Sequence, residues 1–233
     1  MPEPSALLAG IQPVATATIG LLVYRGLRDY LMAGQLQPGQ KLTLRELAQA
    51  LGVSQMPVRE AVRRLAAEGA LEILPNRRIR VVTMTRPRFR ELRSIRLALE
   101  GMAVEAAAGR ISPQEIDRLD AMNQTFTAEM RQTQADGVRL FRVNKDIHFT
   151  IYEAAGMPTL LAMIEGLWLQ VGPLLHFSLH LRANSAGPNP APEWHERLFA
   201  ALRNRDAAAA RAALEGDLTS AGDQILATGI LPD

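Results

Sequence analysis

The sequence contains no cysteine, which excludes disulfide bridges and metal sites built on thiolates. Its apolar runs are interrupted by Gly, Pro or a charged residue well short of the roughly 18 residues that a membrane-spanning helix needs. No positively charged region precedes the apolar residues of the N-terminus, which argues against a secretory signal. From these absences we expect a cytoplasmic protein with no membrane partner.

The residues that are present favour a folded chain of two modest domains. Of the 233 residues, 48% are hydrophobic, which is enough to build ordinary cores. Residues 1–85 hold ten Lys and Arg against six Asp and Glu, whereas the remainder hold sixteen against eighteen. A basic N-terminal part and a mildly acidic C-terminal part are consistent with a polyanion that binds the N-terminal part only, although the excess of positive charge there is small.

A helix-turn-helix is predicted between residues 42 and 70. Thr43 can cap a short first helix, and Gly52 relieves the steric cost of a left-handed break after it. Ser54 can cap the second helix, where Pro57 lies in the first turn and its missing N–H costs little. Apolar residues are expected to point inward from both helices: Leu44, Leu47, Ala48 and Leu51 in the first, and Val58, Ala61, Val62 and Leu65 in the second.

A β-hairpin is predicted directly after the second helix. The β-prone runs 71–74 and 79–83 are joined by a basic turn at 75–78. A helix-turn-helix followed by a basic hairpin is a winged helix-turn-helix, which places its second helix in the major groove of DNA. Any one of these arginines could equally be a solvated surface residue, but the combination of caps, break and basic hairpin indicates DNA binding.

The remaining segments define the predicted domain organisation. Residues 1–16 lack a period and are expected to form a flexible arm, residues 17–83 a DNA-binding domain that begins with an amphipathic helix, and residues 84–87 a linker that ends at Pro87. From residue 88 to residue 233 we find only helical periods and breaks, so the fold is predicted to be mainly α, with a C-terminal all-α antiparallel bundle of about six helices.

The expected helices of this bundle follow from periodicity and caps. Ser112 and Glu115 form a capping box, and Asp206 is an expected N-cap. The first helix is expected to bury a stripe of Leu92, Ile95, Leu99, Ala103 and Ala106. The six helices are predicted at 88–109, 113–134, 138–155, 158–181, 193–204 and 206–228.

The segment PGQKLTLRELAQALGVSQMPVREAVRRLAAEGALEILPNRRIRVV resembles the winged helix of GntR-type bacterial repressors. The resemblance implies operator contacts from Arg45 and Arg59. It departs from the family at Gln55, where an Arg is usual, and at Arg78, near the usual wing Gly. Gln favours adenine where Arg favours guanine, and basic wing residues can enter a narrow minor groove. The candidate DNA-binding residues are Arg45, Ser54, Gln55, Arg59, Arg63, Arg77 and Arg78.

A candidate metal site is the main feature of the predicted bundle, which holds all four histidines of the chain. Asn144 and His148 are four residues apart and share a helix face, while His195 and Asp217 lie on the last two helices. Two imidazoles and a carboxylate form a mixed N/O set that suits Zn²⁺, Mn²⁺ or Ni²⁺. The spacing alone is weak evidence, because a single His in a helix is more often structural.

The back half also resembles the all-helical FCD effector domain of the FadR-type subgroup, through IRLALEGMAVEAAAGRIS, NKDIHFTIYEAAG, LWLQVGPLL and WHERLFAALRNRDAAAARAALEGDL. Many members hold a divalent metal beneath a small-acid pocket with one Asp and three His. The resemblance implies the ligand set Asn144, His148, His195 and Asp217, in which Asn replaces the usual Asp and Asp replaces the last His. The set keeps one negative charge, and an amide oxygen is a weaker ligand than a carboxylate.

The same resemblance gives candidates for the effector pocket. Arg96 matches an arginine that points toward the pocket, where an organic acid could balance its charge; the alternative is a salt bridge with Glu100 at i+4. Trp168 and Gln170 could line the pocket, although an aromatic residue at helical spacing is more often part of a core. His176 and His180 form a second i,i+4 pair, for which we expect a structural or surface role.

Taken together, these patterns predict a ligand-responsive transcriptional regulator, with repression as the expected mode, and no enzyme activity. Its expected partners are double-stranded, near-palindromic operator DNA, a small carboxylate effector and a second copy of the chain. The only expected cofactor is a divalent metal ion. Two alternatives stay open: a metal-dependent hydrolase that uses His148, His195 and Asp217, and a DNA-binding architectural protein whose bundle only forms dimers.

Overall fold

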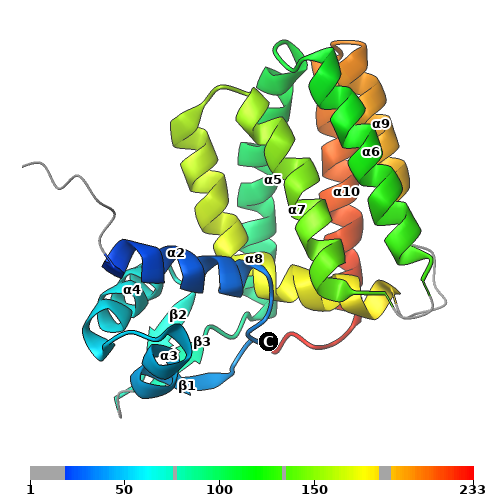
Figure 1. Cartoon of the computed structure of the whole chain (residues 1–233). Coiled ribbons are helices and arrows are strands. Elements are labelled where there is room, and N and C mark those ends of the chain that lie inside the picture. Colours follow the sequence, from blue (N-terminus) through cyan, green and yellow to red (C-terminus); the bar gives the residue numbers. More distant parts are fainter. Residues whose placement is uncertain (1–18, 76–77, 133–134, 184–189) are drawn as a thin grey trace, which may run out of the picture.

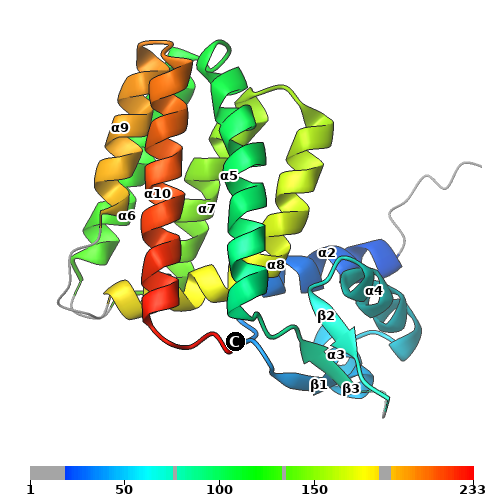
Figure 2. The same cartoon turned by 180° about the vertical axis from the view of Figure 1, so that it is seen from behind.

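The computed structural model describes residues 19–75, 78–132, 135–183 and 190–233. They form a small N-terminal domain and a larger helical bundle that stands on it (Figures 1 and 2). The arm predicted for residues 1–16 and the candidate DNA contact Arg77 lie outside the described residues. The predicted fold class, a winged helix-turn-helix with an all-α bundle, is confirmed.

The N-terminal domain combines a three-helix unit with a small antiparallel sheet in the order β1-β3-β2. The predicted hairpin is present, and Leu71 of its first strand pairs with Val81 of its second. The sequence reading missed β1, whose three residues pair with β3 and are too few to show a strand period. The elements are α2 (Ile19–Met32), β1 (Lys41–Thr43), α3 (Leu44–Leu51), α4 (Gln55–Ala67), β2 (Leu71–Ile73) and β3 (Arg78–Val81).

The turn between α3 and α4 forms largely as predicted. Thr43 begins α3 with a full capping box, and the hydrogen bonds that it donates to the Glu46 carboxylate lower the pKa of Glu46. Gly52 has a φ of 65°, in the left-handed region. Ser54 is the N-cap of α4 in position only, since its side chain makes no capping hydrogen bond to the described backbone of this helix. Leu51, predicted to point inward, is instead 37% exposed at the end of α3.

The two caps should therefore differ in their effect on stability. We expect Thr43→Ala to lower the free energy of unfolding by about 1 kcal/mol, the usual cost of losing an N-cap side chain. Ser54→Ala should change it by well under about 0.5 kcal/mol, as at an ordinary surface position. Urea unfolding of both variants measures this, and an equal loss in the two would contradict the capping geometry.

The C-terminal part contains six helices within the described residues: α5 (Arg86–Ala108), α6 (Pro113–Met130), α7 (Gly137–Ala154), α8 (Pro158–Ala183), α9 (Ala191–Arg203) and α10 (Ala207–Ala227). α5 begins inside the stretch predicted as a linker, because Thr85 caps it and Pro87 occupies its first turn. The capping box of Ser112 and the N-cap Asp206 are confirmed. α6 ends four residues earlier than predicted.

The buried face of α5 differs from the apolar stripe that was predicted. Ile95 is 39% exposed, whereas Arg96 is 4% exposed and Glu100 is fully buried. The prediction was wrong at Ile95, whereas Leu92 and Ala103 of the predicted stripe are buried. Arg96 and Glu100 can both be buried because they form an ion pair with each other.

α8 is bent, and its last part runs across the lower end of the bundle instead of along it (Figure 1). Pro173 lies inside this helix and cannot donate a backbone hydrogen bond, which explains the bend. Contrary to expectation, residues Pro158–Leu179 are long and apolar enough to cross a membrane, by length and composition alone. Half of the apolar window is buried inside the protein, as in the core helix of a bundle.

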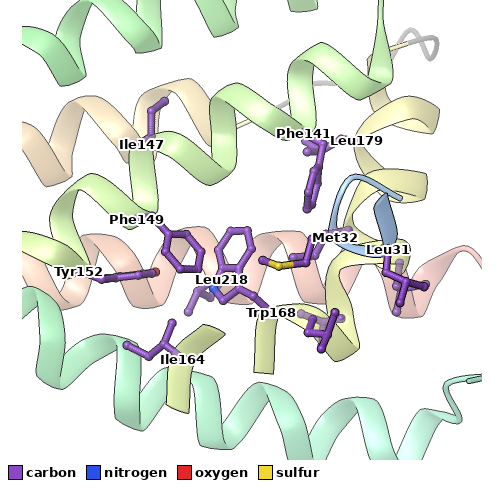
Figure 3. Close-up of a cluster of buried hydrophobic side chains, with 14 of the residues drawn as sticks. Leu31, Met32, Phe141, Ile147, Phe149, Tyr152, Ile164, Trp168, Leu179 and Leu218 are labelled. Carbon is purple, nitrogen blue, oxygen red and sulfur yellow. The ribbon is translucent and has the colours of Figure 1, made fainter. Parts of the chain in front are cut away.

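The two domains share one continuous hydrophobic core. Leu31 and Met32 at the end of α2 belong to the same buried cluster as the bundle side chains Phe141 and Trp168 (Figure 3). Gly172 of α8 lies so close to α2 that a Cβ atom there would be 3.2 Å from the carbonyl oxygen of Met32. The bend of α8 is therefore seated directly on the DNA-binding domain.

Polar contacts close the same junction. Arg28 of α2 and Glu165 of α8 form an ion pair of 2.9 Å. The C-terminal tail returns to this point (Figure 2), where the backbone N–H of Arg86 donates to the carbonyl oxygen of Pro232 over 2.8 Å. The junction is thus closed by an ion pair between α2 and α8 and by a hydrogen bond between the start of α5 and the C-terminal tail.

Candidate functional site

The candidate DNA-binding surface lies on α4 and the elements beside it. Gln55, Arg59 and Arg63 follow one another at intervals of four residues and are all exposed. The opposite face of α4 is buried and fixes the helix in the domain: Val58, Ala61, Val62 and Leu65. This confirms the predicted inward face and leaves the basic face open to a partner.

The other candidate contacts are placed around this helix. Arg45 is exposed in the first turn of α3, and Ser54 is exposed just before α4. Arg78 is exposed at the start of β3, where it pairs with Thr43 of β1. The described candidates therefore come from the helix-turn-helix and from the strand that carries the wing.

Arg64, a basic residue of α4 outside the candidate set, has a structural role. Its guanidinium lies 3.8 Å from the centre of the Tyr24 ring and forms an ion pair with Glu68. The Tyr24 hydroxyl donates to the same carboxylate, and burial and this hydrogen bond raise the pKa of Tyr24. These contacts hold α4 against α2, so the outward arginines are presented on a rigid support.

The candidate metal ligands converge in the bundle. His148 of α7, His195 of α9 and Asp217 of α10 are all buried, and their ligand atoms lie within 4.8 Å of one another. His148 Nε2 is 3.3 Å from Asp217 Oδ2. Asn144 is half-buried one turn before His148 and lines the cavity in which His148 and Asp217 lie. The set is therefore brought together from α7 and from the consecutive helices α9 and α10.

The hydrogen bonds around His148 determine which ring nitrogen can bind a metal. Its Nδ1 is 3.1 Å from the hydroxyl of Tyr152, which donates its own hydrogen to Glu100 over 2.5 Å. Burial and the Glu100 charge raise the pKa of Tyr152 well above its ordinary value, so the hydroxyl keeps this hydrogen. The oxygen can then only accept from His148, which makes Nδ1 the donor and leaves Nε2 as the ring nitrogen that faces Asp217.

His195 is oriented in the same way by Asn123 of α6. Its Nδ1 is 2.9 Å from Asn123 Oδ1, while the amide nitrogen of Asn123 donates to the Pro192 carbonyl over 3.1 Å. Because the amide oxygen can only accept, Nδ1 of His195 carries the hydrogen and faces away from the cluster. Phe126 and Phe199 pack against the ring. Both imidazoles thus use Nδ1 for a hydrogen bond, to partners that were not predicted from the sequence, and Nε2 is the nitrogen that could bind a metal.

Glu100 joins this cluster to α5 and α8. Its carboxylate accepts from Arg96 over 2.7 Å and from Trp168 Nε1 over 3.1 Å, in addition to Tyr152. Arg96 therefore forms the salt bridge with Glu100 that was the alternative to an acid partner. The expectation that an organic acid balances the charge of Arg96 is wrong. Arg96 and Trp168 nevertheless both line the cavity beside Asn144.

The cavity itself is small. Its volume of about 30 Å³ leaves room for one or two water molecules and not for an organic acid. Arg93 also lines it and is held by an ion pair of 2.6 Å with Asp223. In the observed conformation the site therefore has the size of an ion with its bound water.

Two candidates are found elsewhere. Gln170 is not among the described residues that line this cavity; it accepts a hydrogen bond from Arg88 over 2.9 Å near the end of α4, which corrects the prediction. His176 lies beside Gly34 at the domain junction and is not in the described metal cluster. The side chain of His180 lies outside the described residues.

Comparison with known families matches both parts of the chain. The family described as "Bacterial regulatory proteins, gntR family" matches residues 21–81, and the FCD domain matches residues 91–220. The chain belongs to the GntR family. The resemblance inferred from the motifs is confirmed, and this GntR-family protein is a DNA-binding transcriptional regulator and not an enzyme.

Individual relatives align with this chain along most of their length. The HTH-type transcriptional regulator McbR of Escherichia coli (strain K12) is 33% identical over 199 residues, which are 85% of this chain and 89% of McbR. The solved structure titled E. coli McbR/YncC has a TM-score of 0.81 at 28% identity, and covers 92% of this chain and 100% of that chain. The HTH-type transcriptional repressor RspR of the same organism is 25% identical over 210 residues, 90% of each chain.

Proposed function

We propose that this GntR-family regulator binds a divalent metal ion in its bundle and senses a small carboxylate there. The observation that carries the proposal is the buried convergence of His148, His195 and Asp217. Three ligand atoms within 4.8 Å of one another are close enough to converge on an ion such as Zn²⁺, Mn²⁺ or Ni²⁺. The Asn144 side chain would supply an amide oxygen as a fourth ligand.

The donor set fits such an ion for a second reason. Both imidazoles are already fixed with Nδ1 as the donor, so neither has to change its tautomer when Nε2 binds a metal. When bound, the ion would supply positive charge and open positions for a carboxylate oxygen. Arg96 and Arg93 line the same cavity, but each is already ion-paired, with Glu100 and Asp223, so the ion is the group that would attract the acid.

The small size of the cavity explains how binding of an acid could change the conformation of the protein. A carboxylate larger than one or two waters fits only if lining side chains of α8, such as Leu175 and Leu179, move away. The acid therefore binds the moved state more tightly than the observed one, and this difference in affinity is what allostery requires. Because the bend of α8 is seated on Met32, the movement is expected to reach the winged helix.

Repression and dimer formation belong to the same proposal. One recognition helix reads too few base pairs to compete with the rest of a genome, so two copies on a near-palindromic operator are expected. The relative RspR is described as a repressor, which supports repression as the mode of action. Light scattering of the free protein and of its operator complex measures the number of copies.

A thermal-shift screen of small organic acids tests the sensor. We expect at least one acid to raise the midpoint of unfolding when Zn²⁺, Mn²⁺ or Ni²⁺ is present and to lose this effect with a chelator, because it binds through the ion. The same acid should release DNA that the protein selects from a random pool. A bundle that only forms dimers predicts neither effect, so their joint absence would refute the sensor while leaving DNA binding intact.

A further inference from the structure

A second and much larger cavity lies between the two domains. Its volume is about 580 Å³, and none of its described lining residues is shared with the metal cavity. Its walls come from five segments that are distant in sequence: the loop after α2 at Pro38, the segment after β3 at Met84, the start of α7 at Val138, the bend of α8 at Phe177, and the C-terminal tail at Leu231. Figure 1 shows these segments meeting at the junction.

The lining of this junction cavity is mainly apolar. Besides the five residues above, Pro173 and Leu174 contribute from α8. Gln37 and Thr83 supply side chains that can donate and accept hydrogen bonds. A cavity of this size, mostly apolar with a few polar groups and placed at a domain interface, has the properties of a site for an organic molecule of drug size.

The charges of the cavity restrict the class of ligand. Asp136 and His176 are the ionisable side chains among the described lining residues, which include no Lys, Arg or Glu. The Asp136 carboxylate already accepts from the backbone N–H groups of Val138 and Arg139, over 2.9 and 3.2 Å, as the N-cap of α7. It therefore needs no cationic ligand and it repels an anion, while the His176 imidazole offers a hydrogen-bonding group that an uncharged ligand can also use.

We propose that the junction cavity binds an uncharged, largely apolar small molecule with one or two hydrogen-bonding groups. This ligand differs in chemistry from the small carboxylate of the metal site and needs no metal ion. Because its walls belong to both domains, a bound molecule makes contacts that exist only in the observed arrangement of the two domains. It therefore stabilises this arrangement of the winged helix on the bundle.

Binding of the neutral fluorescent probe N-phenyl-1-naphthylamine to the full chain tests this proposal. We expect a saturable rise in fluorescence with one site per chain. Thr83→Trp and Val138→Trp each place bulk in the cavity and should weaken probe binding at least tenfold. Neither side chain is fully buried, so the variants should fold, which far-UV circular dichroism checks. Ile95→Trp adds the same bulk on the exposed face of α5 and should leave binding unchanged.

Two further measurements separate this cavity from the metal site. A chelator and His148→Ala should leave the dissociation constant of the probe unchanged, whereas both should remove the acid-dependent effects of the metal site. The proposal is overturned if the probe shows no saturable binding, if a folded Thr83→Trp or Val138→Trp binds it as the wild type does, or if Ile95→Trp weakens it equally.

Discussion

Replacing Arg59 by Ala should weaken specific operator binding by about 1–3 kcal/mol for each recognition helix that is bound. Arg59 is exposed in the middle of α4, between Gln55 and Arg63 on the same face. The buried residues of the helix are on its other side, so the variant should fold and unfold as the wild type does. Fluorescence anisotropy with DNA selected by the wild type, at one fixed salt concentration, measures the loss.

A matched variant separates direct contact from general electrostatics. Arg118 is an exposed arginine on α6, in the bundle, and Arg118→Ala removes the same charge from the protein. It should leave the operator dissociation constant nearly unchanged. If Arg59→Ala retained wild-type affinity, or if Arg118→Ala lost as much, the assignment of α4 as the recognition helix would be wrong.

His148→Ala and His195→Ala should each remove the bound metal from the purified protein. Each deletes one of three buried ligands, and the other two, with only the weaker amide oxygen of Asn144 beside them, cannot hold a divalent ion against buffer and wash. Elemental analysis after dialysis measures the metal content per chain. His176→Ala is the matched control, because this histidine belongs to the same bundle but lies outside the described metal cluster.

A change in the opposite direction strengthens the test. Asn144→Asp replaces an amide oxygen by a carboxylate on the helix turn next to His148, so it should bind the same metal more tightly than the wild type. Full metal occupancy in either His148→Ala or His195→Ala would refute the site. Equal loss of metal in His176→Ala would show that the ion binds elsewhere.

Local signals predicted those parts of the fold that depend on nearby residues. The capping boxes at Thr43 and Ser112 and the left-handed break at Gly52 are set by side chains within one turn, and all three are present. β1 was missed because a three-residue strand exists only through its pairing with β3, about forty residues later. The face of α5 was misassigned because burial of Arg96 depends on its pairing with Glu100, and not on its own polarity.

The candidate site was predictable to a smaller extent. Helical spacing predicts that Asn144 and His148 share one face of a helix, but it does not predict that α9 and α10 pack beside that face. The complete ligand set was therefore predicted from the resemblance to FCD domains. The residues that orient the imidazoles, Tyr152 and Asn123, act through contacts across the bundle. Tyr152 lies at i+4 from His148 and could have been considered, whereas Asn123 lies 72 positions before His195 and offers no local signal.

The close packing of Gly172 against Met32 limits how hybrid regulators can be engineered from this chain. The sequence suggests that a winged helix could be exchanged between relatives by cutting between β3 and α5. In space, however, the end of α2 packs closely against a helix of the other domain, at a position where a Cβ atom would lie only 3.2 Å from the Met32 carbonyl oxygen. The module that transfers intact therefore includes the bend of α8, and a chimera joined at the sequence boundary alone inherits a mismatched interface.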